Sequence, residues 1–487
     1  MKFFRTISLI LTFAFFLGPF ELPAQQKDSS EKPISGYYKG YIEILGQKLN
    51  IEVKFTSGKD SLNGTIDIPQ QGAHGLALSE IKYASPKIHF ELPNPAMPAR
   101  VAIFDGELKD STVSGQFKQL GMTGVFTLKI AEEVLEKDEP VPYKQEEVSF
   151  KNGDIKLAGT LTYPERKGKF PAIIMITGSG PQNRDEELFG FKPFKIIADH
   201  FTRAGFAVLR YDDRGVGGST GSTRNSTTED FASDALSAVE FLKTLPEIDP
   251  LKIGLCGHSE GGIVAPLAAS RSNNVAFIIL ISGTGVTGEG IIKAQTQLLM
   301  KASGQTDQAI EEQIKLQQKI FNAVRTNEGW DEVKAIIFKD MEKSFNSLSD
   351  EVKKQIPDKV VYINKTVEAQ IDAERTPWFR YFIDYDPLPA LEKVKCPVLM
   401  LFGQKDLQVP TELNRDWMIK ALEKGGNKNY TVKEFPDANH LYIKAVTGGA
   451  EEYATLEKKF VPGFLDFMTG WLKKLYPEVT DTGAVKN

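Results

Sequence analysis

The sequence predicts an α/β domain with a mostly parallel sheet and a helical cap, preceded by an all-β barrel or sandwich. Three patterns carry this prediction. Short runs of alternating apolar and polar residues extend to about residue 130, and continuous apolar runs separated by amphipathic stretches follow from about residue 147. About a hundred charged, helical residues then interrupt that second pattern. Since 487 residues exceed one typical domain, we expect several units.

The composition is that of a globular protein, with 41% hydrophobic and 25% charged residues and a net charge of -5. No long basic run occurs, so we expect no nucleic-acid partner. No cluster of Cys, His and Asp has metal-ligand spacing, and no G-x-x-x-x-G-K phosphate loop is found. We therefore expect neither a metal nor another cofactor, while the oligomeric state stays open.

The first 24 residues have the organisation of a signal peptide. Lys2 and Arg5 form a positive region, an apolar run covers 7–17, and Ala24 offers a small residue for cleavage. An uncleaved anchor is the alternative, but the run is shorter than the roughly 20 residues needed to cross a bilayer. We expect a cleaved signal peptide, a secreted or periplasmic protein, and no stable membrane insertion after cleavage.

Residues 33–130 are predicted to form the N-terminal β-rich domain. Apolar and polar residues alternate at 41–44, 49–53 and 125–128, and Gly, Asn, Asp and Pro separate the runs. This pattern is typical of an antiparallel barrel or sandwich. No catalytic constellation is visible in it, so a carbohydrate-binding role and a cap-contacting role both remain open. Residues 131–146, rich in Glu, Lys and Pro, are predicted to be a linker.

Residues 147–475 are predicted to form the α/β domain. Continuous apolar runs are typical of strands buried on both faces of a parallel sheet. The segment at about 284–387 is too long for a loop, so we expect a helical cap over the carboxyl edge of the sheet, where such folds place their sites. The apolar runs occupy 172–177, 207–211, 253–256, 275–282 and 398–402.

A nucleophile is indicated by the segment GHSEGG at 257–262, which follows a predicted strand and precedes a helical run. This is G-x-S-x-G in the strand–turn–helix context that the motif requires. Side chains two residues on either side of the serine would collide with neighbouring backbone, which explains the glycines. We predict that Ser259 is the nucleophile, the alternative being a glycine-rich turn with a serine N-cap.

The general base can be found by elimination, because the chain has five histidines. Two lie in the β-rich region, one falls in a predicted helix, and one is adjacent to the serine, where its side chain must point away. The remaining one, His440, lies in a loop after a predicted strand at 430–435, and we predict that it is the base. The excluded histidines are His74, His89, His200 and His258.

The acid is expected at the tip of the preceding core strand, where Asp406 follows 398–402. It would fix the imidazole tautomer and stabilise the imidazolium. Asp437, close to His440 in sequence, is the competitor, and Asp384 and Asp386 are further alternatives.

The oxyanion hole requires two backbone N–H donors. One is expected from Glu260, directly after the nucleophile, and the other from the loop at 178–185. Within that loop we favour Ser179, with Gly180 next. The alternative is a plain glycine turn.

These motifs together resemble the α/β-hydrolase superfamily, in particular bacterial carboxylesterases and serine-aminopeptidase-like hydrolases with an N-terminal β-rich domain. The resemblance covers about 147–475, and the β-rich domain more weakly. Many relatives have His-Gly where this chain has Thr177-Gly178; since the loop contributes backbone N–H groups, we expect altered loop packing. The matching segments are GSGPQ at 178–182, YDDRGVGGS at 211–219, GHSEGG at 257–262, GQKD at 403–406 and NH at 439–440.

The sequence therefore predicts hydrolysis of carboxylic esters through an acyl-enzyme, with a small-molecule ester or short peptide as substrate. The alternative is a serine aminopeptidase or amidase with the same triad. An aminopeptidase would need a cap carboxylate for a substrate ammonium, and Asp372, Glu374 and Asp384 are candidates. A non-catalytic binding protein is a remote alternative.

Two further groups of side chains are expected to contact substrate or to support the fold. The aromatic residues Trp378, Phe379 and Phe382 are candidates for lining an acyl or alcohol pocket, with packing of the cap against the core as the alternative. Asp212 and Arg214 are expected to brace the loop after the strand at 207–211.

Overall fold

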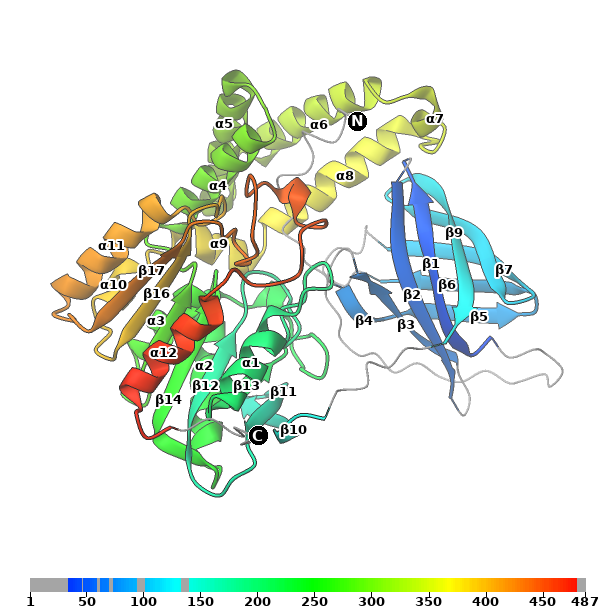
Figure 1. The fold of residues 1–487 in the computed structure, drawn as a ribbon. Coiled ribbons are helices and arrows are strands. Elements are labelled where there is room, and N and C mark those ends of the chain that lie inside the picture. The colour runs from blue at the N-terminus through cyan, green and yellow to red at the C-terminus, as the bar shows by residue number, and fades with distance from the viewer. Residues whose placement is uncertain are drawn as a thin grey trace. The chain divides into compact units, whose positions relative to one another are not determined.

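A computed structural model describes residues 34–45, 47–58, 62–69, 73–93, 101–132 and 140–479 (Figure 1). The predicted signal peptide, residues 1–24, and the middle of the predicted linker lie outside the described residues. The described chain divides into two compact units. The first holds the β-rich region together with Asn322–Thr376, and the second holds Asp138–Phe321 and the chain from Pro377 onward.

The β-rich region is a nine-stranded, wholly antiparallel sheet that curls into a nearly closed barrel, as predicted. The two edge strands, β4 and β5, are consecutive in the chain and are joined by Leu78, whose N–H donates to the Gly64 carbonyl of β3 at 2.9 Å. The strand order is β4-β3-β2-β1-β9-β8-β7-β6-β5. The strands are β1 Gly36–Ile44, β2 Gln47–Ser57, β3 Leu62–Ile68, β4 Ala73–Ala77, β5 Ser79–Ala84, β6 Lys87–Leu92, β7 Ala102–Lys109, β8 Thr112–Gln119 and β9 Met122–Ala131.

The barrel closes around an aromatic core because alternate residues of each strand point inward. Phe90 and Phe104 stack with ring centroids 4.5 Å apart, and Phe126 meets Phe104 edge-on at 5.2 Å. All three rings are fully buried. The alternation seen in the sequence therefore produces one apolar interior.

The first unit also contains a helical hairpin from the predicted cap. It comprises α6 (Trp330–Asn346), the short α7 (Asp350–Lys353) and α8 (Lys359–Glu374). The Thr123 N–H at the start of β9 donates to the Gln355 carbonyl at 2.7 Å, between α7 and α8. The β-rich region therefore contacts part of the cap, which was one of the two roles left open by its sequence.

The second unit is built on an eight-stranded sheet, order β10-β11-β13-β12-β14-β15-β16-β17. The strands from β13 to β17 in this order run parallel, while β10 and β11 pair antiparallel at one edge. The mostly parallel sheet is thereby confirmed. Its strands are β10 Tyr143–Asn152, β11 Ile155–Pro164, β12 Phe170–Ile176, β13 Ala207–Tyr211, β14 Ile248–His258, β15 Ile278–Ile281, β16 Val398–Gly403 and β17 Tyr430–Phe435.

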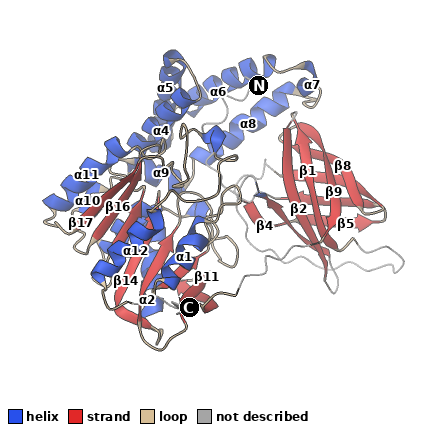
Figure 2. Cartoon of the chain, in the orientation of Figure 1, coloured by secondary structure: helices blue, strands red, loops and turns tan. Residues whose placement is uncertain are grey.

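Helices cover both faces of this sheet, which explains its uninterrupted apolar runs (Figures 1 and 2). Ile174 and Ile176 of β12 pack in one layer, and Ile173 and Met175 pack in the other. The first layer contains α2 (Thr228–Lys243), α3 (Gly261–Ala269), α10 (Leu388–Leu391) and α11 (Thr411–Lys424), and the second contains α1 (Pro193–Arg203) and α12 (Phe464–Leu475).

The remaining cap helices lie between β15 and β16, as the sequence predicts. They are α4 (Gly288–Ala302), α5 (Asp307–Thr326), which crosses from the second unit into the first, and α9 (Pro377–Asp384). The second unit also contains two short 3₁₀ turns, η3 (Thr223–Asn225) and η4 (Ala450–Glu452). Within the described residues, no helix is both long and apolar enough to cross a membrane.

Candidate active site

Ser259 stands on a sharp turn between β14 and α3, beside the central strand β12. Its backbone has φ of 54°, in the left-handed region that residues with side chains rarely occupy. The Ser259 N–H donates to the Ile281 carbonyl at 2.9 Å, which fixes the turn to the end of β15. A strained serine between strand and helix is the geometry of a nucleophile elbow.

The glycines around the serine are required by close backbone contacts. A β-carbon at Gly257 would lie 1.9 Å from the Gly261 carbonyl oxygen, and one at Gly261 would lie 2.2 Å from the Ile176 carbonyl oxygen. Neither position has room for a side chain, because real Cβ contacts below 3.0 Å do not occur. The collision inferred from the sequence is therefore present in the structure.

His440 and Asp406 are in direct contact. His440 Nδ1 lies 2.8 Å from Asp406 Oδ2, and both side chains are buried. The other oxygen of Asp406 accepts the N–H groups of Gln408 and Val409, each at 2.8 Å. Burial alone raises the pKa of Asp406, but the charge and hydrogen bond of His440, with the Val409 N–H, outweigh it and hold that pKa below its ordinary value.

The competing acids do not have this placement. Asp437 is exposed, and among the described residues no hydrogen bond joins it to His440, whose Nδ1 is already engaged by Asp406. Asp384 and Asp386 are exposed as well. The structure therefore brings together His440 and the acid that the strand-tip argument selects.

The loop after β12 lies against the elbow, as expected for an oxyanion loop. A β-carbon at Gly178 would lie 3.2 Å from Ser259 Cβ. The Gly178 N–H donates to Glu186 Oε1 at 2.7 Å and the Gln182 N–H to Asp213 Oδ2 at 2.8 Å, so both are occupied. In the part of the chain that the structure describes, the N–H groups of Ser179, Gly180 and Glu260 have no such partner.

The Glu260 side chain connects the elbow to three other elements. Its carboxylate accepts the Thr228 hydroxyl of α2 at 2.7 Å and the Trp378 indole N–H of α9 at 2.9 Å, with the Ser179 hydroxyl a further donor. Burial raises the pKa of Glu260, and these three donors lower it in part. The hydrogen bonds of its side chain thus hold Glu260 in place, and the backbone N–H of the same residue is a candidate oxyanion donor.

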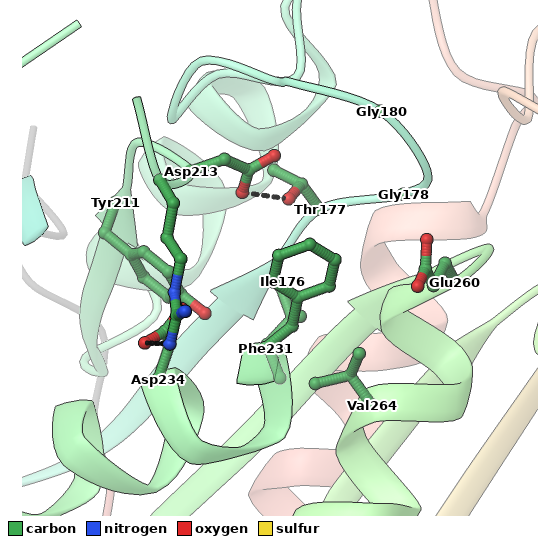
Figure 3. Close-up of a pocket in the computed structure, with 11 residues that line it drawn as sticks. Ile176, Thr177, Gly178, Gly180, Tyr211, Asp213, Phe231, Asp234, Glu260 and Val264 are labelled. Carbon is green, nitrogen blue, oxygen red and sulfur yellow. Dashed lines mark hydrogen bonds and ion pairs between the residues drawn. The ribbon is translucent and has the colours of Figure 1, made fainter. Parts of the chain in front are cut away.

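Asp213 fixes the oxyanion loop from its other side. It accepts the Thr177 hydroxyl at 2.7 Å as well as the Gln182 N–H. Thr177, which stands where many relatives have histidine, is therefore used in loop packing. A pocket opens behind this loop, with Asp213 and Thr177 on one side and Glu260 and Val264 on the other (Figure 3). It is lined by Ile176, Thr177, Gly178, Gly180, Tyr211, Asp213, Arg214, Phe231, Asp234, Glu260 and Val264.

Asp212 and Arg214 make the bracing contacts expected of them. Asp212 receives the Arg184 guanidinium, with Nη2 to Oδ2 at 2.8 Å. The Arg214 guanidinium binds both oxygens of Asp234 on α2, at 2.6 and 2.9 Å. Both pairs tie the β13 loop to its neighbours.

The three cap aromatics predicted as pocket residues make packing contacts. Phe382 is buried against Ile263 of the elbow helix, and Trp378 stacks on it with centroids 5.0 Å apart. Phe379 is also buried, next to Phe321. None of the three lines the pocket of Figure 3. A role in contacting substrate stays a prediction.

His258 has a role that the sequence did not reveal. Its ring contacts that of His440, with centroids 4.6 Å apart. Its partner Glu186 lies 72 positions away in the chain. No local motif links the two residues, so only the fold could reveal the contact.

The three cap carboxylates considered for binding a substrate ammonium differ in burial. Glu374 is buried at the end of α8, and burial raises its pKa to about 8. Asp372 is half-buried and Asp384 is exposed. No group of three or more His, Cys, Asp or Glu side chains within the described ranges could hold a metal ion.

The sheet order, the elbow and the helical insertion after β15 together define an α/β-hydrolase fold, which confirms the resemblance seen in the sequence. Residues 152–423 match the X-Pro dipeptidyl-peptidase (S15) family. The match covers more than half of the chain, and the protein belongs to this family.

Curated relatives match parts of the chain. Esterase EstD of Thermotoga maritima is 27% identical over 301 residues, which cover 61% of this chain and 61% of EstD. Thiohydrolase apmlB of Arthrinium phaeospermum is 34% identical over 141 residues, 28% of this chain and 42% of apmlB. The chain thus spans about three fifths or less of these relatives.

Among solved structures, an esterase of Pyrococcus furiosus is 16% identical, with a TM-score of 0.41. The similarity covers 72% of this chain and 94% of that esterase.

Proposed function

We propose that this protein hydrolyses carboxylic esters through an acyl-enzyme formed on Ser259. The contact between His440 Nδ1 and Asp406 Oδ2 at 2.8 Å carries the proposal. With Nδ1 engaged by a carboxylate, the ring proton resides on Nδ1 and Nε2 is left as the basic nitrogen. Ser259 on its strained turn supports the assignment, because the fold uses that turn to present a nucleophile.

The proposed reaction has two halves. In the first, His440 Nε2 takes the Ser259 proton while Oγ attacks the ester carbonyl carbon. The oxyanion accepts the N–H of Glu260 and that of Ser179 or Gly180, and collapse expels the alcohol, which receives the proton from His440. In the second, His440 deprotonates a water that attacks the acyl carbon, and the acid leaves as Ser259 recovers its proton.

Esters are favoured over amides on chemical grounds. An alkoxide leaves readily from the tetrahedral intermediate, whereas an amine must be protonated as it departs, which demands closer placement of the scissile nitrogen. An aminopeptidase would also use a carboxylate to hold the substrate ammonium. Burial raises the pKa of Glu374 to about 8, which disfavours the negative charge that such a contact needs. The name of EstD supports the same choice.

A peptidase is the second candidate, since the family is described by cleavage after X-Pro dipeptides. The same triad and oxyanion donors would serve, with a free substrate amine as the distinguishing requirement.

The deciding experiment compares kcat/KM on p-nitrophenyl acetate and butyrate with kcat/KM on alanine, proline and alanyl-proline p-nitroanilides. We expect the esters to exceed every anilide, and Ser259→Ala to abolish turnover while the protein stays folded. Because activated esters react easily, detection of ester cleavage alone decides nothing. An anilide that matches the esters, and that requires its free amine, would establish the peptidase instead.

We further propose that the protein acts after export, on the strength of the signal-peptide pattern at 1–24. N-terminal sequencing of the protein recovered from the native host checks this, with a mature terminus following Ala24 as the expected result. An intact N-terminus on active protein inside the cell would contradict it.

A further inference from the structure

His258 lies at the end of β14, immediately before the nucleophile, and connects two loops of the site. Its Nε2 donates to the His440 carbonyl oxygen at 2.9 Å, and its Nδ1 lies 2.9 Å from Glu186 Oε1. Both side chains are buried, His258 with 6% and Glu186 with 2% of its surface exposed. A polar pair this deeply buried is costly unless its contacts are made in full.

The hydrogen-bond partners of His258 fix a proton on Nε2 and favour a charged ring. A carbonyl oxygen only accepts, so Nε2 carries a proton. Glu186 Oε1 accepts the Gly178 N–H at 2.7 Å and lies 2.9 Å from His258 Nδ1, so an imidazolium that donates from both nitrogens to the Glu186 carboxylate and the His440 carbonyl satisfies every contact of the ring. Burial lowers the pKa of His258, but the charge and hydrogen bond of Glu186 and the His440 carbonyl outweigh it and raise that pKa.

Glu186 makes this contact with an unfavourable backbone conformation and with one carboxylate oxygen unsatisfied. Its backbone has φ of 50°, which a residue with a side chain rarely adopts. Its Oε2 is buried and, among the described residues, has no hydrogen-bond partner. Both features cost free energy, and they persist because the surrounding contacts compensate for them.

We propose that the His258–Glu186 ion pair is a positioning unit that sets the oxyanion loop and the His440 loop relative to Ser259. On one side Glu186 holds the Gly178 N–H, which leaves Ser179 and Gly180 to face the substrate. On the other side His258 holds the backbone of the base itself. Through His258, which adjoins Ser259 in the chain, both loops are fixed to the nucleophile.

This role rests on the proposed acyl-enzyme function and adds to it. The triad and the oxyanion donors come from separate loops, and displacement of a reacting group by about 1 Å can cost about 10²-fold in rate. Substrate binding depends less on that alignment. Loss of the unit should therefore reduce kcat far more than it changes KM.

The test uses variants that remove one contact each. His258→Asn keeps a donor near the Nδ1 position and loses the bond to the His440 carbonyl, whereas His258→Gln keeps a donor near the Nε2 position. Glu186→Gln keeps an oxygen for the Gly178 N–H and removes the charge. His200→Gln, a histidine of α1 outside the site, is the matched control.

All variants are assayed on p-nitrophenyl butyrate, with kcat normalised to active sites titrated by the p-nitrophenol burst. We expect His258→Asn and Glu186→Gln each to lower kcat about 10- to 100-fold with KM within threefold, His258→Gln to recover part of the loss, and His200→Gln to match the wild type. The double variant should lose little more than either single one, because the pair acts as a unit.

Two results would overturn the positioning role. One is a normalised kcat within threefold of wild type in both His258→Asn and Glu186→Gln. The other is additive losses with kcat and KM moving together. Ser259→Ala separates this from the parent proposal: if it retains turnover, the acyl-enzyme function fails, whereas an inactive Ser259→Ala beside unaffected pair variants refutes the positioning role alone.

Discussion

The barrel and the eight-stranded sheet both bury an apolar interior, yet they differ in the charged side chains that they bury. In the described residues of the barrel, 34–132, every buried side chain is apolar or tyrosine. The second unit has an equally apolar core but also buries charged groups, among them Asp406, His258 and Glu260. Packing stability alone thus explains the apolar interior of the barrel. The buried polar groups of the second unit need another explanation.

The buried charges of the second unit gather where its strands end. Asp406 follows β16, His258 ends β14, and Asp212 follows β13. Removing a charge from water costs several kcal/mol, so each survives only with partners. Such clusters are characteristic of functional sites. In the barrel, by contrast, ionic contacts such as Lys39–Glu52 at 2.9 Å stay partly in solvent, where they contribute little.

The largest effect should come from Asp406→Asn. The amide cannot hold His440 in the tautomer with Nε2 unprotonated, and we expect kcat to fall about 10⁴-fold, the loss known for the equivalent change in a serine protease. Ester hydrolysis with circular dichroism as a folding check measures it. Asp437→Asn is the matched control, and a greater loss there would transfer the acid role to Asp437.

Two alanine substitutions test whether a buried, ion-paired carboxylate contributes more to the free energy of unfolding than a partly exposed one. Asp234 is buried and makes the two shortest contacts of the Arg214 guanidinium, so Asp234→Ala leaves Arg214 with only the longer contacts to Ser226 and Asp230 and should lower the free energy of unfolding by about 3 kcal/mol. Asp105 on the barrel is partly exposed beside His89, so Asp105→Ala should cost less than about 1 kcal/mol. Urea unfolding measures both, and equal costs would contradict the comparison.

Glu374 is the exception in the first unit, as its one buried Asp, Glu, Lys, Arg or His side chain among the described residues. Burial raises its folded pKa to about 8 from an ordinary 4.5. Between these values the folded state keeps a proton that the unfolded state releases, so stability falls as pH rises from about 4.5 to 8. Glu374→Gln should remove this slope and gain up to a few kcal/mol over wild type at pH 8, with near-equality at pH 4.5.

Thermal unfolding at pH 4.5, 6 and 8 gives that comparison. Parallel pH profiles for wild type and Glu374→Gln would show that Glu374 already ionises at its ordinary pKa.

The smallest effect concerns the link from α9 to the elbow. Trp378→Phe keeps an aromatic ring against Phe382 but removes the N–H that binds both oxygens of Glu260 at 2.9 and 3.0 Å. We expect kcat on p-nitrophenyl butyrate to fall about 3- to 10-fold, which corresponds to the net contribution of about 0.5–1.5 kcal/mol of one ordinary hydrogen bond. Phe379→Leu, which leaves that contact intact, is the control, and an equal loss in it would assign the effect to general cap packing.

The fold was predictable because its signals are local. Period-two alternation predicts the barrel, continuous apolar runs predict the sheet, and the charged helical segment at about 284–387 contains α5 and α6. The elbow was predictable for the same reason, since Gly257, Ser259 and Gly261 lie close together in the chain.

The remaining features depend on contacts between distant residues. The His258–Glu186 pair joins positions 72 apart, and the burial of Glu374 depends on what packs around α8. The sequence also predicted one cap at about 284–387, whereas Asn322–Thr376 groups with the barrel. No periodicity in that segment could indicate which unit its helices pack against.

That grouping has a consequence for the order in which the protein is made. The barrel strands are synthesised first, but Thr123 must wait for Gln355, about 230 residues later, before their hydrogen bond can form. The sheet of the second unit is likewise incomplete until β16 and β17 appear, after the hairpin has been made. Closing such long loops is slow, because chain entropy is lost before the contact is gained. Neither unit is finished before the other has begun, and assembly of the nascent chain is interleaved.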